Sequence, residues 1–270
     1  MCPVCGKNEA LAFRPGLSRC RACGLVCRDE RRFKEPVYAE NTVEDIYVSA
    51  KLGLFAQALR VLGKLAPAKG RLLDVGSAYG DFMDAAEKDG WKAEGVEISG
   101  KPAETASKKG FKVYTRPVEE LGLPENIYNA VVVYEVFCLM AEPARATEEM
   151  FRILKPGGVL FAREFNASFH MTVHPLERKG LFGKLRPSIV HNFNFSAETL
   201  RVMLEREGFK DIKIRNSPPT SGDPYRTGGR LGGFLTGAIK VLYYWLAQAL
   251  WVITLGRVFA GSTLIVTARK

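Results

Sequence analysis

The sequence predicts an α/β fold, in which a doubly wound and mostly parallel sheet of seven strands carries helices on both faces. Strand and helix patterns alternate regularly from Arg71 to Arg215, and such alternation builds parallel sheets. At 90–92, 110–112 and 208–210 a helix pattern ends in glycine, and an aromatic residue and a lysine follow. Each glycine suits a left-handed helix cap and each aromatic residue starts a strand. The run 131–133 is apolar without alternation, as expected for a central strand that is buried on both faces.

These patterns divide the chain into five parts. The core is expected at 69–216, with strands at 71–75, 92–97, 111–115, 129–134, 158–165 and 209–215, and 262–270 supplies its closing strand. A helical linker or lid is expected at 34–68, where apolar residues recur near the helical period, among them Tyr47 and Phe55. The remaining parts are 1–33, a small N-terminal zinc ribbon, and 217–261, a loop followed by a hydrophobic helix.

Composition limits the class of protein and its partners. The 270 residues are enough for one large domain and a small one, and 39 basic against 29 acidic residues give a net charge of +10. This charge favours an anionic partner, which leaves nucleic acid, an anionic membrane surface and a phosphorylated substrate open. Cys2 follows Met1 directly, without a signal-peptide pattern, so a reducing cytoplasmic location is expected.

Two Cys-x-x-Cys pairs near the start predict a metal site. The pairs end at Cys5 and Cys23 and are separated by 14 residues, and a glycine follows each pair. Zinc binds four such thiolates in a tetrahedron, and each short turn supplies two of them from one side. We therefore expect a closed, structural zinc site with no open position for catalysis. Its expected ligands are Cys2, Cys5, Cys20 and Cys23.

The stretch 72–82 predicts a nucleotide-binding loop. An apolar strand reaches Asp74, passes Gly76 and Gly80, and continues into a helix that begins near Phe82. Glycines let the backbone approach a ligand, and the free N–H groups of the helix start point toward it. No Gly-Lys-Ser/Thr ending is present, and Asp74 and Asp81 would repel a pyrophosphate. Two carboxylates instead suit a cationic ligand such as S-adenosylmethionine (SAM), with its sulfonium and ammonium groups.

A second acid completes the pattern. The next strand ends in Glu97, 21 positions after Gly76, where an acid can accept hydrogen bonds from ribose hydroxyls. With this acid, the glycine loop and Lys-Pro-Gly-Gly at 155–158, the region from about 70 to 215 resembles class I SAM-dependent methyltransferases. Ala78 stands where that family usually has the middle glycine of its first motif. The resemblance implies a Rossmann-like fold and cofactor contacts from Asp74, Gly76, Ser77, Gly80, Glu97, Ile98, Val118, Glu119 and Tyr134.

Candidates for acid–base chemistry follow the fifth strand. That strand ends at Glu164, and all three histidines of the chain come next: His170, His174 and His191. In open α/β sheets the ligand lies beyond the carboxyl ends of the strands, so these side chains are expected at the same crevice as the glycine loop. A histidine near neutral pKa suits a hydroxyl acceptor. His191 is the first choice, followed by His174, His170 and Glu164, and a structural role is the alternative for each histidine.

Three functions fit these features. The first is methylation of a small molecule, a sugar or a lipid-linked saccharide, as in some bacterial methyltransferases that carry an N-terminal zinc ribbon. The second is RNA methylation, because a zinc ribbon and a basic surface suit nucleic acid. The third is a non-catalytic protein that binds partners through the ribbon. The residues do not distinguish O-, N- and C-methylation.

A hydrophobic helix at 241–255 indicates where the protein works. Its expected length of about 22 Å is short of a hydrocarbon core of roughly 30 Å. One face is apolar and includes Trp245 and Leu250, and the other carries Lys240 and Gln248. Such a helix suits peripheral contact with an anionic membrane on its cytoplasmic side. The alternative is a helix that packs on its own domain or at a dimer interface.

Overall fold

A computed structural model describes residues 1–29, 44–181, 188–220 and 229–270, and for 44–50 and 229–236 it describes the backbone alone. The boundary predicted at 33/34 and the side chain of Tyr47 lie outside the described residues. So does the part of the loop predicted at 217–261 that spans 221–228.

One seven-stranded sheet forms the centre of the molecule, in the strand order β10-β11-β8-β7-β4-β5-β6. The strand β11 runs antiparallel to both of its neighbours, and the other neighbouring pairs are parallel. The predicted doubly wound, mostly parallel sheet is thus confirmed. Its strands are β4 (Arg71–Val75), β5 (Lys92–Val96), β6 (Lys112–Tyr114), β7 (Tyr128–Tyr134), β8 (Leu154–Phe165), β10 (Lys210–Asn216) and β11 (Thr263–Arg269).

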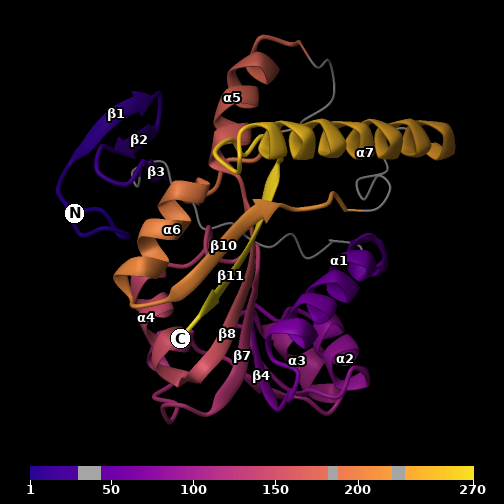
Figure 1. Cartoon of the computed structure of the whole chain (residues 1–270). Helices are drawn as coiled ribbons and strands as arrows, with labels where there is room; N and C mark the ends of the chain where they lie inside the picture. Colours follow the sequence, from indigo (N-terminus) through magenta and orange to yellow (C-terminus); the bar gives the residue numbers. More distant parts are fainter. Residues whose placement is uncertain (30–43, 182–187, 221–228) are drawn as a thin grey trace.

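Helices cover both faces of this sheet (Figure 1). One face carries α1 (Glu44–Leu65), α2 (Asp81–Lys88) and α3 (Gly100–Lys108), and the other carries α4 (Pro143–Ile153) and α6 (Ala197–Arg206). The valines of β7 show why its sequence lacks alternation. Val131 and Val133 pack in one buried cluster, while Val132 packs in the cluster on the opposite face with Phe55 of α1.

Most predicted boundaries differ from the observed ones by one or two residues. The exception in the sheet is β8, which begins at Leu154 rather than 158 because Leu154 already pairs with Tyr128 of β7. Phe55 belongs to the core, where its ring meets those of Phe82 and Tyr134 edge-on, at centroid distances of 5.5 and 5.4 Å. Two further helical elements are the 3₁₀ turn η2 (Val118–Glu120) and α5 (Ala167–Arg178).

The N-terminal region forms a small antiparallel sheet of β1 (Ala10–Arg14), β2 (Leu17–Cys20) and β3 (Val26–Arg28). Its fourth strand is β9 (Phe193–Asn194), which lies in sequence between α5 and α6 of the core. The ribbon is therefore continuous with the core through a shared sheet. No pattern in the sequence of residues 193–194 predicts this connection.

The hydrophobic helix α7 spans Gly229–Ile253, so it begins twelve residues before the predicted 241 and ends two before the predicted 255. It crosses the edge of the sheet at which β10 ends (Figure 1). The side-chain amide of Asn216, the last residue of β10, donates to the carbonyl oxygen of Ala247 and to Oε1 of Gln248, each at 3.1 Å. Within the described part of the chain, no helix is both long enough and apolar enough to cross a bilayer.

Candidate active site

The glycine loop after β4 has the conformation that its sequence predicts. Gly76 and Gly80 have φ angles of 82° and 83°, in the left-handed region that favours glycine. A Cβ atom on Gly76 would lie 2.3 Å from Cγ2 of Val136, so no larger residue fits there. The N–H groups of Gly76 and Ser77 both donate to the carbonyl oxygen of Val96, at 2.8 and 3.0 Å, and this fixes the loop across β5.

Two buried polar atoms in this loop suit a ligand. Asp74 and Ser77 are 2% and 4% exposed, and among the described residues Asp74 Oδ1 and Ser77 Oγ have no hydrogen-bond partner. Burial, with a smaller contribution from the nearby Glu97 carboxylate, raises the pKa of Asp74 to about 8. A buried carboxyl group without a partner is costly to ionise. A cation that donates hydrogen bonds would satisfy both atoms.

Glu97 joins the glycine loop to the loop that follows β5. Its Oε2 accepts from the N–H of Ala78 at 3.0 Å, and its Oε1 accepts from the N–H of Ser99 at 2.8 Å. The neighbouring Ile98 is 65% exposed, so its side chain is accessible to a ligand bound at this loop.

The remaining three predicted cofactor residues differ in exposure. Val118 is buried and Glu119 is half-buried, and burial raises the pKa of the Glu119 carboxyl group. Tyr134 is buried among aromatic rings, and its hydroxyl donates to the carbonyl oxygen of Leu54 in α1 at 3.2 Å. This contact joins α1 to the end of β7.

A buried charge cluster that sequence reasoning missed lies at the ends of β7 and β8. Glu135 forms ion pairs with Lys51 of α1, at 3.0 Å, and with Arg163 of β8. Arg163 also donates to Oγ of Ser217 at 2.8 Å and to Oγ1 of Thr263 at 3.0 Å. Lys51 and Arg163 are 5% and 2% exposed. The available signal was a charged residue, Arg163, inside an otherwise apolar strand, because a buried charge requires partners.

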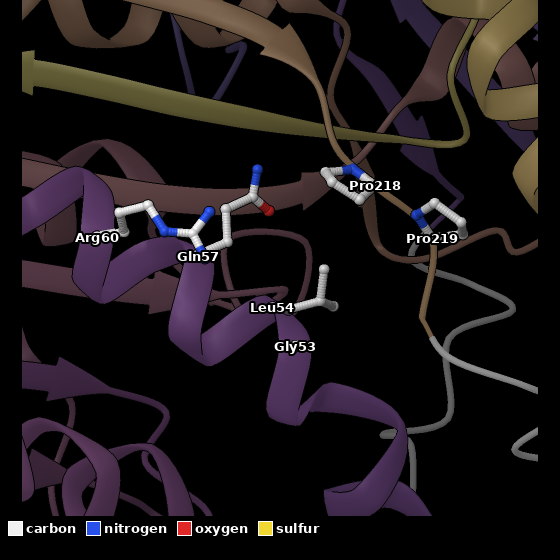
Figure 2. Close-up of a pocket in the computed structure, with 6 residues that line it drawn as sticks. All are labelled: Gly53, Leu54, Gln57, Arg60, Pro218 and Pro219. Carbon is white, nitrogen blue, oxygen red and sulfur yellow. The ribbon is translucent and has the colours of Figure 1, made fainter.

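A hollow of about 320 Å³ borders this cluster (Figure 2). It lies between α1 and the segment after β10, where Nη2 of Arg163 donates to the carbonyl oxygen of Pro218 at 3.4 Å. Its lining residues are Gly53, Leu54, Gln57, Arg60, Pro218 and Pro219.

Three of the four acid–base candidates are already hydrogen-bonded within the fold. His170 uses both ring nitrogens: Nε2 lies 3.0 Å from the carbonyl oxygen of Ser262, and Nδ1 accepts from the N–H of Ile189 at 3.1 Å. His174 lies 3.1 Å from Oγ of Ser188. Glu164 accepts from the N–H groups of Phe165 and Cys138, at 2.8 and 3.3 Å. Burial lowers the pKa of His170 to about 4 and raises that of Glu164 to about 7.

His191 differs from these three. Its ring lies against Phe165 at the end of β8, with centroids 4.9 Å apart and planes at 31°. Nε2 is buried and has no hydrogen-bond partner among the described residues. Burial, and secondarily the charge of Arg28, lowers its pKa to about 4. The ring is therefore neutral at pH 7, but it is a weaker base than the near-neutral histidine that the sequence predicts.

The four predicted metal ligands converge in the ribbon. The Sγ atoms of Cys2, Cys5, Cys20 and Cys23 all lie within 4.8 Å of one another, with Cys2–Cys23 and Cys5–Cys20 at 3.6 Å. A tetrahedral zinc ion with Zn–S bonds of about 2.3 Å needs sulfur atoms about 3.8 Å apart. The four thiols could therefore hold zinc with small adjustments.

Comparison with known proteins identifies the family. Residues 48–214 match the model of a family described as a methyltransferase domain. The chain belongs to this family, and its sheet and glycine loop are those of the class I fold. Its methyltransferase domain has the fold of solved SAM-dependent methyltransferases.

Curated relatives and solved structures agree with this assignment. The ubiquinone/menaquinone biosynthesis C-methyltransferase UbiE of Chromobacterium violaceum is 30% identical over 101 residues, which cover 36% of this chain and 41% of the relative. An uncharacterized protein of Methanocaldococcus jannaschii is 29% identical over 152 residues, or 54% of this chain and 67% of that protein. The chain thus spans less than half of the first relative's length.

Among solved structures, a SAM-dependent methyltransferase from Archaeoglobus fulgidus has a TM-score of 0.54 and 19% identity, over 81% of this chain and 94% of that one. Phosphoethanolamine N-methyltransferase 2 of Haemonchus contortus in complex with SAM has a TM-score of 0.56 and 16% identity, over 91% of this chain and 61% of that one. At these identities the likeness concerns the fold.

Proposed function

We propose that this enzyme methylates an acceptor carried by a lipid, of the lipid-linked saccharide class, at an anionic membrane surface. The observation that carries the proposal is the orientation of α7, whose apolar face is turned away from the protein.

The outward face of α7 is strongly hydrophobic. Six large apolar side chains on it are each 61–77% exposed: Ile239, Leu242, Trp245, Leu246, Val252 and Ile253. The inward face is the more polar one. It includes the buried Ala247, together with the half-buried Lys240, Tyr244, Gln248, Trp251 and Thr254. A surface helix of a water-soluble domain normally has the opposite orientation. The predicted alternative in which the apolar face packs on its own domain is therefore not supported.

A membrane suits this face better than a second protein copy because of charge. Residues 217–261 contain four basic residues and one acidic residue, within a chain of net charge +10. Basic residues next to an apolar helix favour anionic headgroups, and tryptophan and tyrosine favour the interfacial depth. The UbiE relative is named for ubiquinone and menaquinone biosynthesis, and a lipophilic acceptor would likewise be met at a membrane.

A continuous series of ring contacts leads from α7 to the candidate base. Tyr243 of α7 lies 5.5 Å from Phe169, and Phe169 lies 5.0 Å from His170. His170 in turn lies 5.7 Å from Phe165, the ring against which His191 packs. An acceptor whose lipid is anchored in a membrane against the outward face of α7 would thus have its head group near the carboxyl ends of the strands.

The roles proposed for the site residues follow from their geometry. Asp74 and Ser77 would receive the cationic end of SAM, and Glu97 its ribose, with Gly76 and Gly80 allowing close approach. SAM supplies an electrophilic methyl group, so the protein mainly has to align the acceptor with it. His191 would accept the proton of a hydroxyl acceptor. The four cysteines of the ribbon would hold one structural zinc ion.

RNA methylation remains the second candidate, and the ribbon supports it less than its composition suggests. Arg28 donates to the carbonyl oxygen of Val190 at 2.7 Å, and Arg14 donates to that of Met171. Two of the ribbon arginines therefore bind the protein itself rather than offering their charge to RNA.

Liposome flotation tests the membrane proposal. The wild type should float with vesicles of phosphatidylglycerol and phosphatidylcholine at low salt, and less with phosphatidylcholine alone. Replacing Trp245→Glu together with Leu246→Glu should reduce flotation by at least about tenfold, because two large apolar side chains, each worth about 1.5–3 kcal/mol when removed from water, become charged.

The matched control is Leu11→Glu together with Leu52→Glu, which adds the same charge at exposed leucines on β1 and α1. This variant should float like the wild type. Sedimentation equilibrium separates the alternatives. If the wild type does not bind vesicles and is a dimer, and the α7 variant is a monomer, the apolar face of α7 is the contact with a second copy of the chain.

A further inference from the structure

The segment that carries His191 is held from two sides. On one side, residues 193–194 form β9 and pair with β3 of the ribbon, Val26 opposite Asn194 and Cys27 opposite Phe193. On the other side, the N–H of Phe193 donates to the carbonyl oxygen of Cys138, in the loop that follows β7. The segment therefore fills the space between the ribbon and the carboxyl edge of the large sheet.

Asn194 connects the backbone of His191 directly to the ribbon. Its Oδ1 accepts from the N–H of His191 at 3.0 Å, and its Nδ2 donates to the carbonyl oxygens of His191, at 2.9 Å, and of Val26, at 3.2 Å. One buried side chain thus fixes both backbone groups of His191 and reaches strand β3.

Arg28 makes a second connection. Its backbone N–H donates to the carbonyl oxygen of Asn192 at 2.8 Å, and its guanidinium donates to that of Val190 at 2.7 Å. The residues on both sides of His191 are therefore held by one ribbon residue. Arg28 also lies close enough for its charge to disfavour protonation of His191.

The ribbon in turn depends on its four cysteines. β2 ends at Cys20 itself, and β3 begins three residues after Cys23. The strands are three to five residues long, too short to be stable without a metal ion or tertiary support.

From these contacts we propose that the zinc ribbon is a positioning element of the active site, which holds His191 at the end of β8 through Arg28 and Asn194. This inference rests on the proposed role of His191. The metal would then act only by holding the ribbon in place, which requires no open coordination position. Loss of zinc would loosen the segment that carries His191 and leave β4 and the glycine loop intact.

The three histidines of the chain provide the test, because each gives its own imidazole signals in ¹⁵N NMR spectra, assigned from His→Ala variants. Among the described residues, the charged or titratable groups that affect His191 are Arg28 of the ribbon and His170 of α5, and the ring of Phe165 is uncharged. Metal analysis should first find about one zinc per chain. In the zinc-loaded wild type, His191 should stay neutral down to about pH 5, consistent with its lowered pKa of about 4.

Arg28→Ala should raise the titration midpoint of His191 by about one pH unit toward the ordinary value near 6.5, because both the charge and the anchoring are lost. Arg28→Lys, which keeps the charge, should stay closer to the wild type. Arg206→Ala is the matched control, because Arg206 donates to the carbonyl oxygen of Val4 at 2.8 Å and thus joins the ribbon to α6 instead. Its His191 titration should not change.

Removal of zinc with a chelator should raise the midpoint further and broaden the His191 signals, while amide signals from β4 and β5 persist. An unchanged His191 titration in zinc-free protein with native amide signals would overturn the proposal. If chelation unfolds the entire chain, the zinc-loaded Arg28→Ala variant decides by itself. A His191 titration midpoint equal to that of the wild type would then overturn the proposal. Because this measurement needs no acceptor and no turnover, its failure is separate from a failure of the proposed function.

Discussion

The two sides of the proposed active site are built in different ways. The proposed cofactor side consists of β4, the glycine loop and the end of β5, and its connecting hydrogen bonds join residues about 20 positions apart, such as Ala78 to Glu97. The proposed acceptor side joins parts that are far apart in sequence, such as Arg28 to Val190 and Val26 to Asn194, which are 162 and 168 positions apart. The glycine loop is a local motif and can be recognised in the sequence without the fold. The acceptor side is assembled from distant segments, so its substrate specificity can change without any change in that motif.

The largest expected effect of a substitution is a loss of turnover on the acceptor side. His191→Ala should lower turnover by roughly 10²–10⁴-fold, the usual contribution of a positioned base, and leave SAM affinity nearly unchanged. Turnover is measured as the mass gain of one methyl group on a panel of lipid-linked and nucleotide sugars, and affinity by calorimetry. His174→Ala is the comparison, because its ring is already hydrogen-bonded to Ser188. The reverse ranking of the two variants would assign the base to His174.

A smaller effect, on SAM affinity rather than on turnover, is expected on the cofactor side. Glu97→Ala should weaken SAM binding by about 1.5–3 kcal/mol, roughly 10- to 150-fold, because charge-assisted hydrogen bonds are lost. Glu104→Ala, on the exposed surface of α3, removes the same charge and should bind SAM like the wild type. Calorimetry with both variants gives the comparison, and equal affinities would exclude the ribose role of Glu97.

The last expected effect, smallest when compared per pH unit, is a pH dependence on the same side. Because the pKa of Asp74 is raised to about 8, the folded apoprotein holds this proton more tightly than the unfolded chain does. The contribution of Asp74 to stability should therefore fall as pH rises from about 4 to about 8. Ionised Asp74 suits cationic SAM, so SAM affinity should rise by up to about tenfold per pH unit between about pH 5.5 and 7.5.

Asp74→Asn supplies the control, because an amide does not titrate in this range. In this variant the slope of SAM affinity should disappear and the slope of stability should lose the Asp74 contribution, while Glu164 and the buried histidines still titrate. Thermal denaturation and calorimetry across the same pH values measure the two slopes. A pH-independent affinity in the wild type would mean that Asp74 is already ionised in the apoprotein.

The predictability of the structure follows the same division. The sheet, its order of elements and the glycine loop were predictable because each depends on a local pattern, such as the apolar run 131–133 or the glycines at 76 and 80. The Lys51–Glu135–Arg163 cluster was not, because its members come from three elements and only the charge of Arg163 in an apolar strand indicated it. Nothing local in the sequence of Phe193–Asn194 shows that these two residues pair with the ribbon.

The histidines illustrate the limit most clearly. All three follow β8 in sequence and are chemically equivalent at that level. Tertiary contacts alone separate His170, with both nitrogens hydrogen-bonded, from His191, whose Nε2 has no partner among the described residues. Burial and partners, rather than residue type, thus decide which of them is available for chemistry.

The insertion that contains α7 has its two ends fastened together. Asn216 closes β10, and its Oδ1 accepts from the N–H of Gly261, just before β11 begins, at 3.0 Å. β10 and β11 are neighbours in the sheet, with Asn216 opposite Leu264. The 45 residues from 217 to 261 therefore leave and re-enter the fold at almost one point. In evolutionary terms this is a hairpin turn into which a separate helical unit can be placed, lengthened or removed while the central sheet stays the same.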